Sequence, residues 1–541
     1  MGAGPVRWKD RYLSGRVGPL PSPRFRPATG LRRFRRDERG SLAIFGLFCL
    51  LIMVLVAGLA VDLSRFEHRR TMMQNTLDRA ILAAADMSQT LVPEDVVDDY
   101  FEKAGLADVD VTVDVEDGFN YRTVSATTSV EVPTMFVKNM GVDQFAAPAL
   151  GTAEERIGNV DISLVLDVSG SMGWDASGTT KSKIELLHEA ATDFVETMFD
   201  TVQGPGVPAG KLSINIVPYN QQAVIGADLA QHFNLSNEHA ASACADFVSS
   251  DYASAAITPG QALPRTAHAD ARYSNSSPQF VECQENATTT MMAWETSETA
   301  LTNRIGLLTA YGDTAIDVGM KWGVALLDPA LRPVVTDRIA AGKVSGDLSG
   351  RPFDYNDGEA MKVIVVMTDG ENTNTYALKH PYRSGDSPLV EGADGRDYYH
   401  YPERSGSYDF YRTSNNSWYK LSQIGGDFDV YTWPEVWAKH TVRYFDNRYV
   451  REIFGNIGFY NAAVRRTSYG AKDSQLLATC TAAKSQGVLV FAIGFEAPSA
   501  GQSVMRSCAT SDAFYYDAQG LSIADAFAGI ASAINALRLT Q

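Results

Sequence analysis

The chain has 541 residues, of which 45% are hydrophobic and 21% are charged, so it is neither disordered nor of low complexity throughout. Its formal net charge is −17, although residues 1–40 hold 11 Lys or Arg against three Asp or Glu. The remaining body is therefore strongly acidic, which argues against nucleic acid as a partner because the two would repel each other. Five cysteines are too few for a disulfide scaffold, and they show no zinc-ligand spacing.

An apolar run, GSLAIFGLFCLLIMVLVAGLAV, occupies residues 40–61 and is long enough to cross a bilayer as one helix. It predicts a basic cytoplasmic tail at residues 1–40 and a transmembrane helix at residues 41–63. More arginines precede the span than follow it, which predicts a cytoplasmic N-terminus and a periplasmic body, with Asp62 near the outer interface. A cleaved secretory signal and twin-arginine export are the alternatives, although the apolar part of a secretory signal normally has only ~7–15 residues.

The next two segments predict a stalk and a small module. Residues 64–92 have a heptad-like apolar pattern that predicts an amphipathic stalk helix, one face of which packs against the following domain. Residues 93–157 begin with a short helical pattern and continue with alternating valines at 109–115 and a returning strand at 123–132. This order predicts a small α+β module without chemistry of its own.

Residues 158–541 have the pattern of an α/β domain. Buried-type strands are predicted at residues 160–166, 212–217, 363–367 and 488–493, with helical segments between them. Two stretches, about 229–302 and about 376–468, are far longer than ordinary loops and predict partly ordered insertions. The second is crowded with Tyr, Trp and Phe. These rings are suited to recognition of a protein or glycan. The favoured interpretation is that they pack together as the hydrophobic core of the insertion.

Four cysteines lie in the predicted exported part, where an oxidising compartment favours disulfides. Three pairings are possible for four cysteines. The simplest is local and joins Cys244 to Cys283 and Cys480 to Cys508, which leaves Cys49 as a thiol in the membrane.

Oxygen-bearing side chains follow two of the predicted strands and open one helix. Residues 161–172 read DISLVLDVSGSM, and strand 363–367 is followed by TDGEN, while the turn YGDTA at 311–315 precedes a helix. The carboxyl ends of parallel strands meet at one edge of a sheet, where ligands bind. Carboxylate and hydroxyl oxygens are donors suited to a hard cation, so the sequence predicts a site for Mg²⁺ or Mn²⁺.

The motifs DVSGS, GDTAIDVGM and VVMTDGEN resemble the three loops of a von Willebrand factor A (vWA) domain with a metal-ion-dependent adhesion site. The resemblance implies a doubly wound, Rossmann-like α/β fold for residues 158–541. It also implies that three residues offer hydroxyls to the cation and that two carboxylates act directly or through water, with a carboxylate of a protein ligand completing the shell. The five residues are Asp167, Ser169, Ser171, Thr314 and Asp369.

A second resemblance lies at the N-terminus. Residues 39–44, 60–62, 78–80 and 83–86, together with VPYN at 217–220, resemble TadG-type proteins of the tight-adherence (Flp) pilus system. The resemblance implies a bacterial inner-membrane protein, or one that reaches the cell surface, which takes part in pilus assembly. Its expected partners are pilus or envelope components.

These residues are compatible with three functions. The first is cation-dependent binding of a protein or surface during pilus assembly, and the second is a structural anchor whose metal site only stabilises loops. The third is a phosphohydrolase using Asp167, but such chemistry needs a second carboxylate where Ser169 stands. We therefore expect no enzymatic activity.

Overall fold

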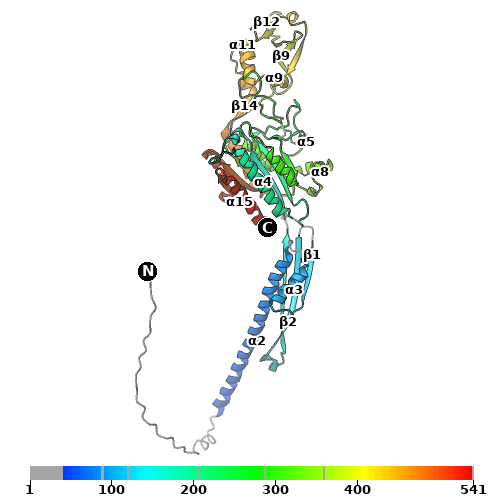
Figure 1. Ribbon diagram of the computed structural model, residues 1–541, viewed down its shortest axis with the longest axis vertical. Coiled ribbons are helices and arrows are strands. Elements are labelled where there is room, and N and C mark those ends of the chain that lie inside the picture. Colours follow the sequence, from blue (N-terminus) through cyan, green and yellow to red (C-terminus); the bar gives the residue numbers. More distant parts are fainter. Residues whose placement is uncertain are drawn as a thin grey trace, which may run out of the picture. The chain divides into compact units, whose positions relative to one another are not determined.

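The computed structural model describes residues 40–86, 91–117, 121–156, 158–204, 206–285, 288–357 and 360–538 (Figure 1). The predicted basic tail lies outside the described residues, except for its last residue. The chain forms two compact units. The first consists of Met1–Glu116 with Thr123–Glu154, and the second of Glu155–Gln541 with Asp117–Arg122.

In the first unit, one continuous helix contains both the predicted span and the predicted stalk, which continues the span as the sequence indicates. Helix α2 runs without a break over Gly40–Ala85. Among the described residues it is the one helix long and apolar enough to cross a membrane. Its large apolar side chains between Leu42 and Leu63 are exposed, whereas Met73, Leu77 and Ile81 are buried. The predicted stalk end at residue 92 is wrong, because α2 ends at Ala85 and a second helix starts at Pro93.

The small module consists of that second helix and a three-stranded sheet. Helix α3 is Pro93–Lys103, and the sheet has the order β1–β2–β3. The strands are β1 Val111–Asp117, β2 Tyr121–Pro133 and β3 Gln144–Arg156, with the short 3₁₀ helix η1 at Val137–Met140 between β2 and β3. The amphipathic half of α2 contributes to one core with α3 and this sheet. Its apolar stripe is therefore explained by packing.

The second unit is built on a six-stranded sheet of order β16–β15–β7–β4–β5–β6. Neighbouring strands are parallel, except that β6 is antiparallel to β5. Alternate side chains face opposite cores: Ile162 and Leu164 on β4 belong to one core, and Val165 belongs to the other. The strands are β4 Asn159–Asp167, β5 Leu212–Tyr219, β6 Met292–Glu295, β7 Ala360–Thr368, β15 Leu489–Phe495 and β16 Tyr515–Ala518.

Helices cover both faces of this sheet. One core takes side chains from α4 Lys183–Val202, α6 Glu298–Gly306 and α15 Ser522–Arg538. The other takes side chains from α7 Ile316–Ala325, α8 Arg332–Ala340, α13 Tyr469–Ser485 and α14 Ser499–Cys508. Figure 1 shows α4 and α15 beside each other along the sheet. A mostly parallel sheet between two helical layers is a doubly wound α/β fold.

The first insertion is shorter than predicted. It contains α5 Ala227–Ala230, the 3₁₀ helix η3 Ser249–Ala253 and long loops. The last part of the predicted range, 229–302, holds β6 and the start of α6, which belong to the sheet and to one of its helical layers. The sequence does not reveal β6 because four residues, MAWE, carry no readable alternation.

The second insertion forms a lobe on a two-stranded ribbon. Strands β8 Thr375–Leu378 and β14 Val464–Thr467 pair antiparallel at its base. Between them lie a sheet of order β12–β11–β10–β9–β13 and several short helices. The strands are β9 Asp386–Gly392, β10 Asp397–His400, β11 Phe410–Arg412, β12 Ser417–Tyr419 and β13 Phe428–Thr432, and the helices are α9 Trp433–Lys439, α10 Val442–Phe445, α11 Arg451–Phe454 and α12 Phe459–Ala463.

Aromatic side chains fill this lobe. Trp433, Trp437, Phe445 and Tyr449 are buried together, and the Trp433 and Trp437 rings stack at 5.0 Å between centroids. Most of the lobe's rings therefore build its own core, which is the interpretation that the sequence favours.

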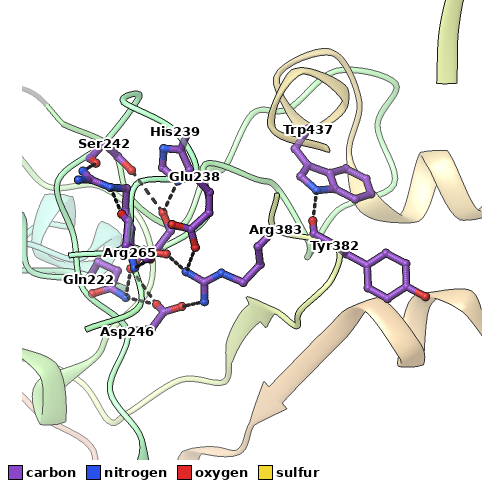
Figure 2. A network of polar contacts seen from close by, with 11 residues as sticks. Gln222, Glu238, His239, Ser242, Asp246, Arg265, Tyr382, Arg383 and Trp437 are labelled. Carbon is purple, nitrogen blue, oxygen red and sulfur yellow. Dashed lines mark hydrogen bonds and ion pairs between the residues drawn. The ribbon is translucent and has the colours of Figure 1, made fainter. Parts of the chain in front are cut away.

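Arg383 joins the second insertion to the first (Figure 2). Its guanidinium lies 3.2 Å from Glu238 Oε1 and 3.4 Å from Asp246 Oδ2, and it also donates to the carbonyl of Arg265. Nearby, Trp437 Nε1 donates to the carbonyl of Tyr382 at 2.8 Å. Arg383 is largely buried with both carboxylates, so the two insertions are held together by a shielded ionic contact.

Both disulfides join the pairs that the sequence predicts. Cys244 and Cys283 close a loop of the first insertion, with a Cα–Cα distance of 6.0 Å. Cys480 on α13 is joined to Cys508 at the end of α14, with a Cα–Cα distance of 5.2 Å. Cys49 on α2 is a free thiol.

Glu282, next to the first disulfide, gives the second unit a pH-dependent stability. Burial raises the pKa of its carboxyl from 4.5 to about 8, and the ammonium of Lys472 offsets only part of this rise. The contribution of this proton to the free energy of unfolding is therefore greatest below pH 4.5 and falls as the pH rises toward 8. The slope is about 1.4 kcal/mol per pH unit.

The Glu282→Gln variant should lose less stability than the wild type when the pH rises from about 5 to about 8. Thermal unfolding of the full chain across this range measures the difference. Glu196→Gln, a change of an exposed glutamate on α4, is the matched control. A Glu282→Gln profile parallel to that of the wild type would show that the Glu282 carboxyl ionises normally.

Candidate metal centre

Three loops meet at the carboxyl edge of the six-stranded sheet. The first follows β4 and contains the 3₁₀ helix η2 Gly170–Gly173, the second precedes α7, and the third follows β7. Backbone hydrogen bonds join them: Gly170 N donates to Gly312 O at 2.9 Å, and Thr373 N donates to Thr314 O at 2.9 Å. The positions of the side chains on these loops are therefore fixed relative to one another.

Four of the five predicted metal-binding residues lie in one hydrogen-bonded group. Ser169 N donates to Asp167 Oδ1 at 2.7 Å, and the hydroxyls of Ser169 and Ser171 are 3.2 Å apart. Ser171 Oγ donates to Asp369 Oδ1 at 2.7 Å. Asp167, Ser169 and Asp369 are buried, whereas Ser171 is only partly so. The group therefore has one side open to solvent.

Thr314, the fifth predicted residue, comes from the loop before α7. A Cβ atom built on Gly370, the neighbour of Asp369, would lie 3.7 Å from Thr314 Oγ1. The hydroxyl thus faces the loop that carries Asp369. Thr373 holds this position, because Thr314 N donates to Thr373 Oγ1 at 3.1 Å. Lys472 Nζ also donates to Thr314 O, at 3.2 Å.

The two carboxylates of the group repel each other. Burial and the nearby charge of Asp369 raise the pKa of Asp167 to about 7. Hydrogen bonds from Thr368 Oγ1 at 2.7 Å and from Ser169 N oppose this rise by stabilising the ionised form. A bound cation would relieve the same repulsion, and so this pair of carboxylates fits a divalent ion.

Lys183 and Glu496 also belong to the site, and the sequence does not point to either of them. Lys183 Nζ lies 3.0 Å from Asp369 Oδ2 and 3.8 Å from Glu496 Oε2, with its side chain 8% exposed. Lys183 is the first residue of α4, where the helix dipole disfavours a positive charge, so the two carboxylates compensate it. Glu496 follows β15 directly, and the rule that parallel strand ends meet at one edge could have found it.

The donor set suits a hard cation. It consists of two carboxylates and three hydroxyls, without histidine or cysteine. Within the described ranges, no three His, Cys, Asp or Glu side chains gather as a metal cluster, so any ion here depends on the Ser and Thr oxygens. Oxygen donors with room for water ligands are what Mg²⁺ and Mn²⁺ take. The residues present therefore fit the predicted ion.

The chain thus combines an apolar helix of membrane-spanning length with a doubly wound α/β domain that carries oxygen donors at its carboxyl edge. Residues 40–87 match the Tad family model, described as Flp pilus-assembly TadE/G-like. This match confirms the resemblance that the sequence shows at its N-terminus, and it places a TadE/G-like segment at residues 40–87. No curated protein matches the chain significantly.

Several solved structures are similar to the chain at low identity. The vWF domain of the type V pili tip protein Mfa5 from Porphyromonas gingivalis is 13% identical with a TM-score of 0.31, covering 71% of this chain and 97% of that one. The PilB minor pilin from Streptococcus sanguinis is 12% identical with a TM-score of 0.29, covering 79% and 78%. Proximal thread matrix protein 1 from the mussel byssus is 11% identical with a TM-score of 0.26, covering 70% and 46%.

Proposed function

We propose that this protein is a membrane-anchored component of Flp pilus assembly whose vWA-type domain binds a protein ligand through a divalent cation. The observation that carries the proposal is the meeting of Asp167, Ser169, Ser171 and Asp369 at one edge of the sheet. These residues and Thr314 would hold Mg²⁺ or Mn²⁺. The ion would supply positive charge for a carboxylate of the ligand.

The surrounding residues position these donors. Thr368 and the amide of Ser169 orient the Asp167 carboxylate, and Ser171 orients that of Asp369. The partly exposed Ser171 leaves an approach for a ligand. The ammonium of Lys183 lies beside Asp369 and would compete with a bound cation for that carboxylate. Its positive charge would therefore lower the affinity of the site for the cation.

The proposed topology places the N-terminus in the cytoplasm and the body outside the inner membrane. The basic tail before α2 supports this orientation, because positive residues are retained on the cytoplasmic side. Two disulfides in the second unit support an oxidising compartment. The partners would then be pilus or envelope proteins.

Capture on the full-length chain tests the proposal. The purified chain in detergent is incubated with solubilised cell envelope in Mg²⁺, washed, and eluted with a chelator before the released proteins are identified. We expect a pilus or envelope protein to elute from the wild type and to be absent from an Asp167→Ala/Asp369→Ala bait. Mg²⁺ could stabilise the wild type against heat while the chelator releases no protein. The metal would then only stabilise the loops, and the proposed binding of a protein ligand would be wrong.

A further inference from the structure

In the first unit, the loop between β2 and β3 is fastened to α2 near the end of its apolar stretch. Asp62 on α2 is only 2% exposed. Its carboxylate accepts backbone hydrogen bonds from Met135 N at 2.9 Å, Phe136 N at 2.8 Å and Val137 N at 2.9 Å. Three hydrogen bonds to one carboxylate hold the loop firmly to this point of the helix.

The loop also reaches back along the apolar part of α2. A Cβ atom built on Gly58 would lie 2.6 Å from Phe136 Cβ and Cγ, so Phe136 rests directly on the helix where a glycine leaves room. Gly58 precedes Asp62 by about one turn, or ~6 Å along the helix axis. The loop therefore overlaps the segment of α2 that would span the membrane.

Several apolar side chains of the loop are exposed. Met135 is 63% exposed, Phe136 45%, Met140 61% and Val142 38%. Leu59, Val61 and Leu63 on the adjoining turns of α2 are also exposed. An apolar surface of this kind is costly in water. Lys138 is exposed within the same loop and can reach lipid phosphate while its stem stays in apolar surroundings.

Some polar backbone groups of the loop are paired within it. Thr134 Oγ1 donates to Val142 O at 2.6 Å, and Thr134 N donates to Asp143 O at 3.0 Å. Gly141 N donates to Lys138 O at 3.0 Å. Together with the amides bonded to Asp62, these contacts reduce the number of backbone groups that would lose water when the loop enters the bilayer interface.

We propose that residues 134–142 insert into the outer leaflet of the bilayer and form a second membrane contact beside α2. The occupant of the apolar surface is lipid, because the surface is continuous with the exposed apolar turns of the helix that spans the membrane. The proposal rests on the anchoring of α2 under the proposed function. Its consequence is that the small α+β module is held at the membrane surface and that α2 cannot rotate freely about its axis.

Nitroxide labels on the full-length chain in liposomes of phosphatidylcholine and phosphatidylglycerol test the insertion. In a Cys49→Ser background, Met140→Cys is compared with Leu150→Cys, which is equally apolar and 68% exposed on β3. Leu150 O accepts a hydrogen bond from Gln74 Nε2 at 3.0 Å, and Gln74 lies about 18 Å beyond Asp62 along α2. The measured quantity is the accessibility of each label to O₂, which concentrates in lipid, and to a water-soluble nickel chelate.

We expect the O₂-to-nickel ratio at position 140 to exceed that at position 150 severalfold. Equal ratios at the two positions would overturn the proposal. Spin–spin broadening at position 140 in samples with little protein per lipid would also overturn it, because a second copy of the chain would then cover the loop.

The native Cys49 separates failure of this proposal from failure of the anchor. A label at Cys49 should lie in lipid, since its side chain belongs to the apolar run of α2. A lipid-exposed label at Cys49 with a water-exposed label at position 140 would contradict the insertion of the loop but not the anchoring of α2. A water-exposed label at Cys49 would overturn the anchor as well. The Asp62→Ala variant should release the loop from α2. The label at position 140 should then become more accessible to the nickel chelate and less accessible to O₂.

Discussion

Replacing Asp369 with Asn is expected to weaken Mn²⁺ binding by the full-length chain roughly 100-fold or more. Asp369 is buried, accepts a hydrogen bond from Ser171, and is one of only two carboxylates in the predicted ligand set. An amide of the same shape keeps the packing but removes the charge that attracts a divalent ion. Titration of Mn²⁺, followed by electron paramagnetic resonance of the free ion, measures the affinity.

Two further variants make this test specific. Asp512→Asn changes an aspartate whose side chain is 84% exposed, and it should leave the affinity unchanged. Lys183→Met should tighten Mn²⁺ binding about tenfold, because it removes the ammonium that lies 3.0 Å from Asp369 Oδ2. Thermal unfolding in chelator verifies that each variant is folded. Unchanged affinity in a folded Asp369→Asn protein would show that the ion binds elsewhere or not at all.

Replacing Arg351 with Met is expected to destabilise the second unit by about 3–5 kcal/mol. Arg351 is 1% exposed, and its guanidinium donates to the carboxylate of Asp161 and to the carbonyl of Gly210. It also lies 3.2 Å from Lys211 O. Without the guanidinium, the Asp161 carboxylate would stay buried without its ion-pair partner, and its Oδ2 atom already lacks a hydrogen-bond partner. Urea denaturation of the full chain measures the loss.

The double variant Arg351→Met/Asp161→Leu should recover much of this loss, because it removes the stranded charge together with its partner. Arg332→Met provides the comparison, since Arg332 pairs with Asp354 at 3.0 Å where both side chains are exposed, 36% and 63%. Such a pair contributes about 0–1 kcal/mol. If Arg351→Met cost no more than Arg332→Met, the buried pair would not stabilise the fold.

The central strands could be predicted from the sequence and the edge strands could not. β4, β5, β7 and β15 are runs of buried apolar residues, which leave a clear pattern. The edge strands β6 and β16 have four residues each, too few for any periodicity to be read. The boundary of the first insertion was wrong for the same reason.

The candidate site divides in a similar way. Asp167, Ser169, Ser171 and Asp369 lie at or just after the ends of strands that the sequence reveals, so the direction of those strands brings them together. Lys183 reaches Asp369 across 186 positions of sequence, and Asp62 reaches Val137 across 75. Contacts of this kind depend on how helices pack against loops, which no local pattern encodes.

One side chain joins the base of the aromatic lobe to the candidate metal centre. Lys472 Nζ donates to Thr314 O at 3.2 Å and to Thr375 Oγ1 at 2.9 Å, so one ammonium ties the start of β8 to the loop that carries Thr314. A force that displaced the lobe would therefore act on this loop through Lys472. An ion that fixed the loop would also make the base of the lobe more rigid. By reciprocity, a force that pulled on the lobe would lower the affinity of the site for the ion.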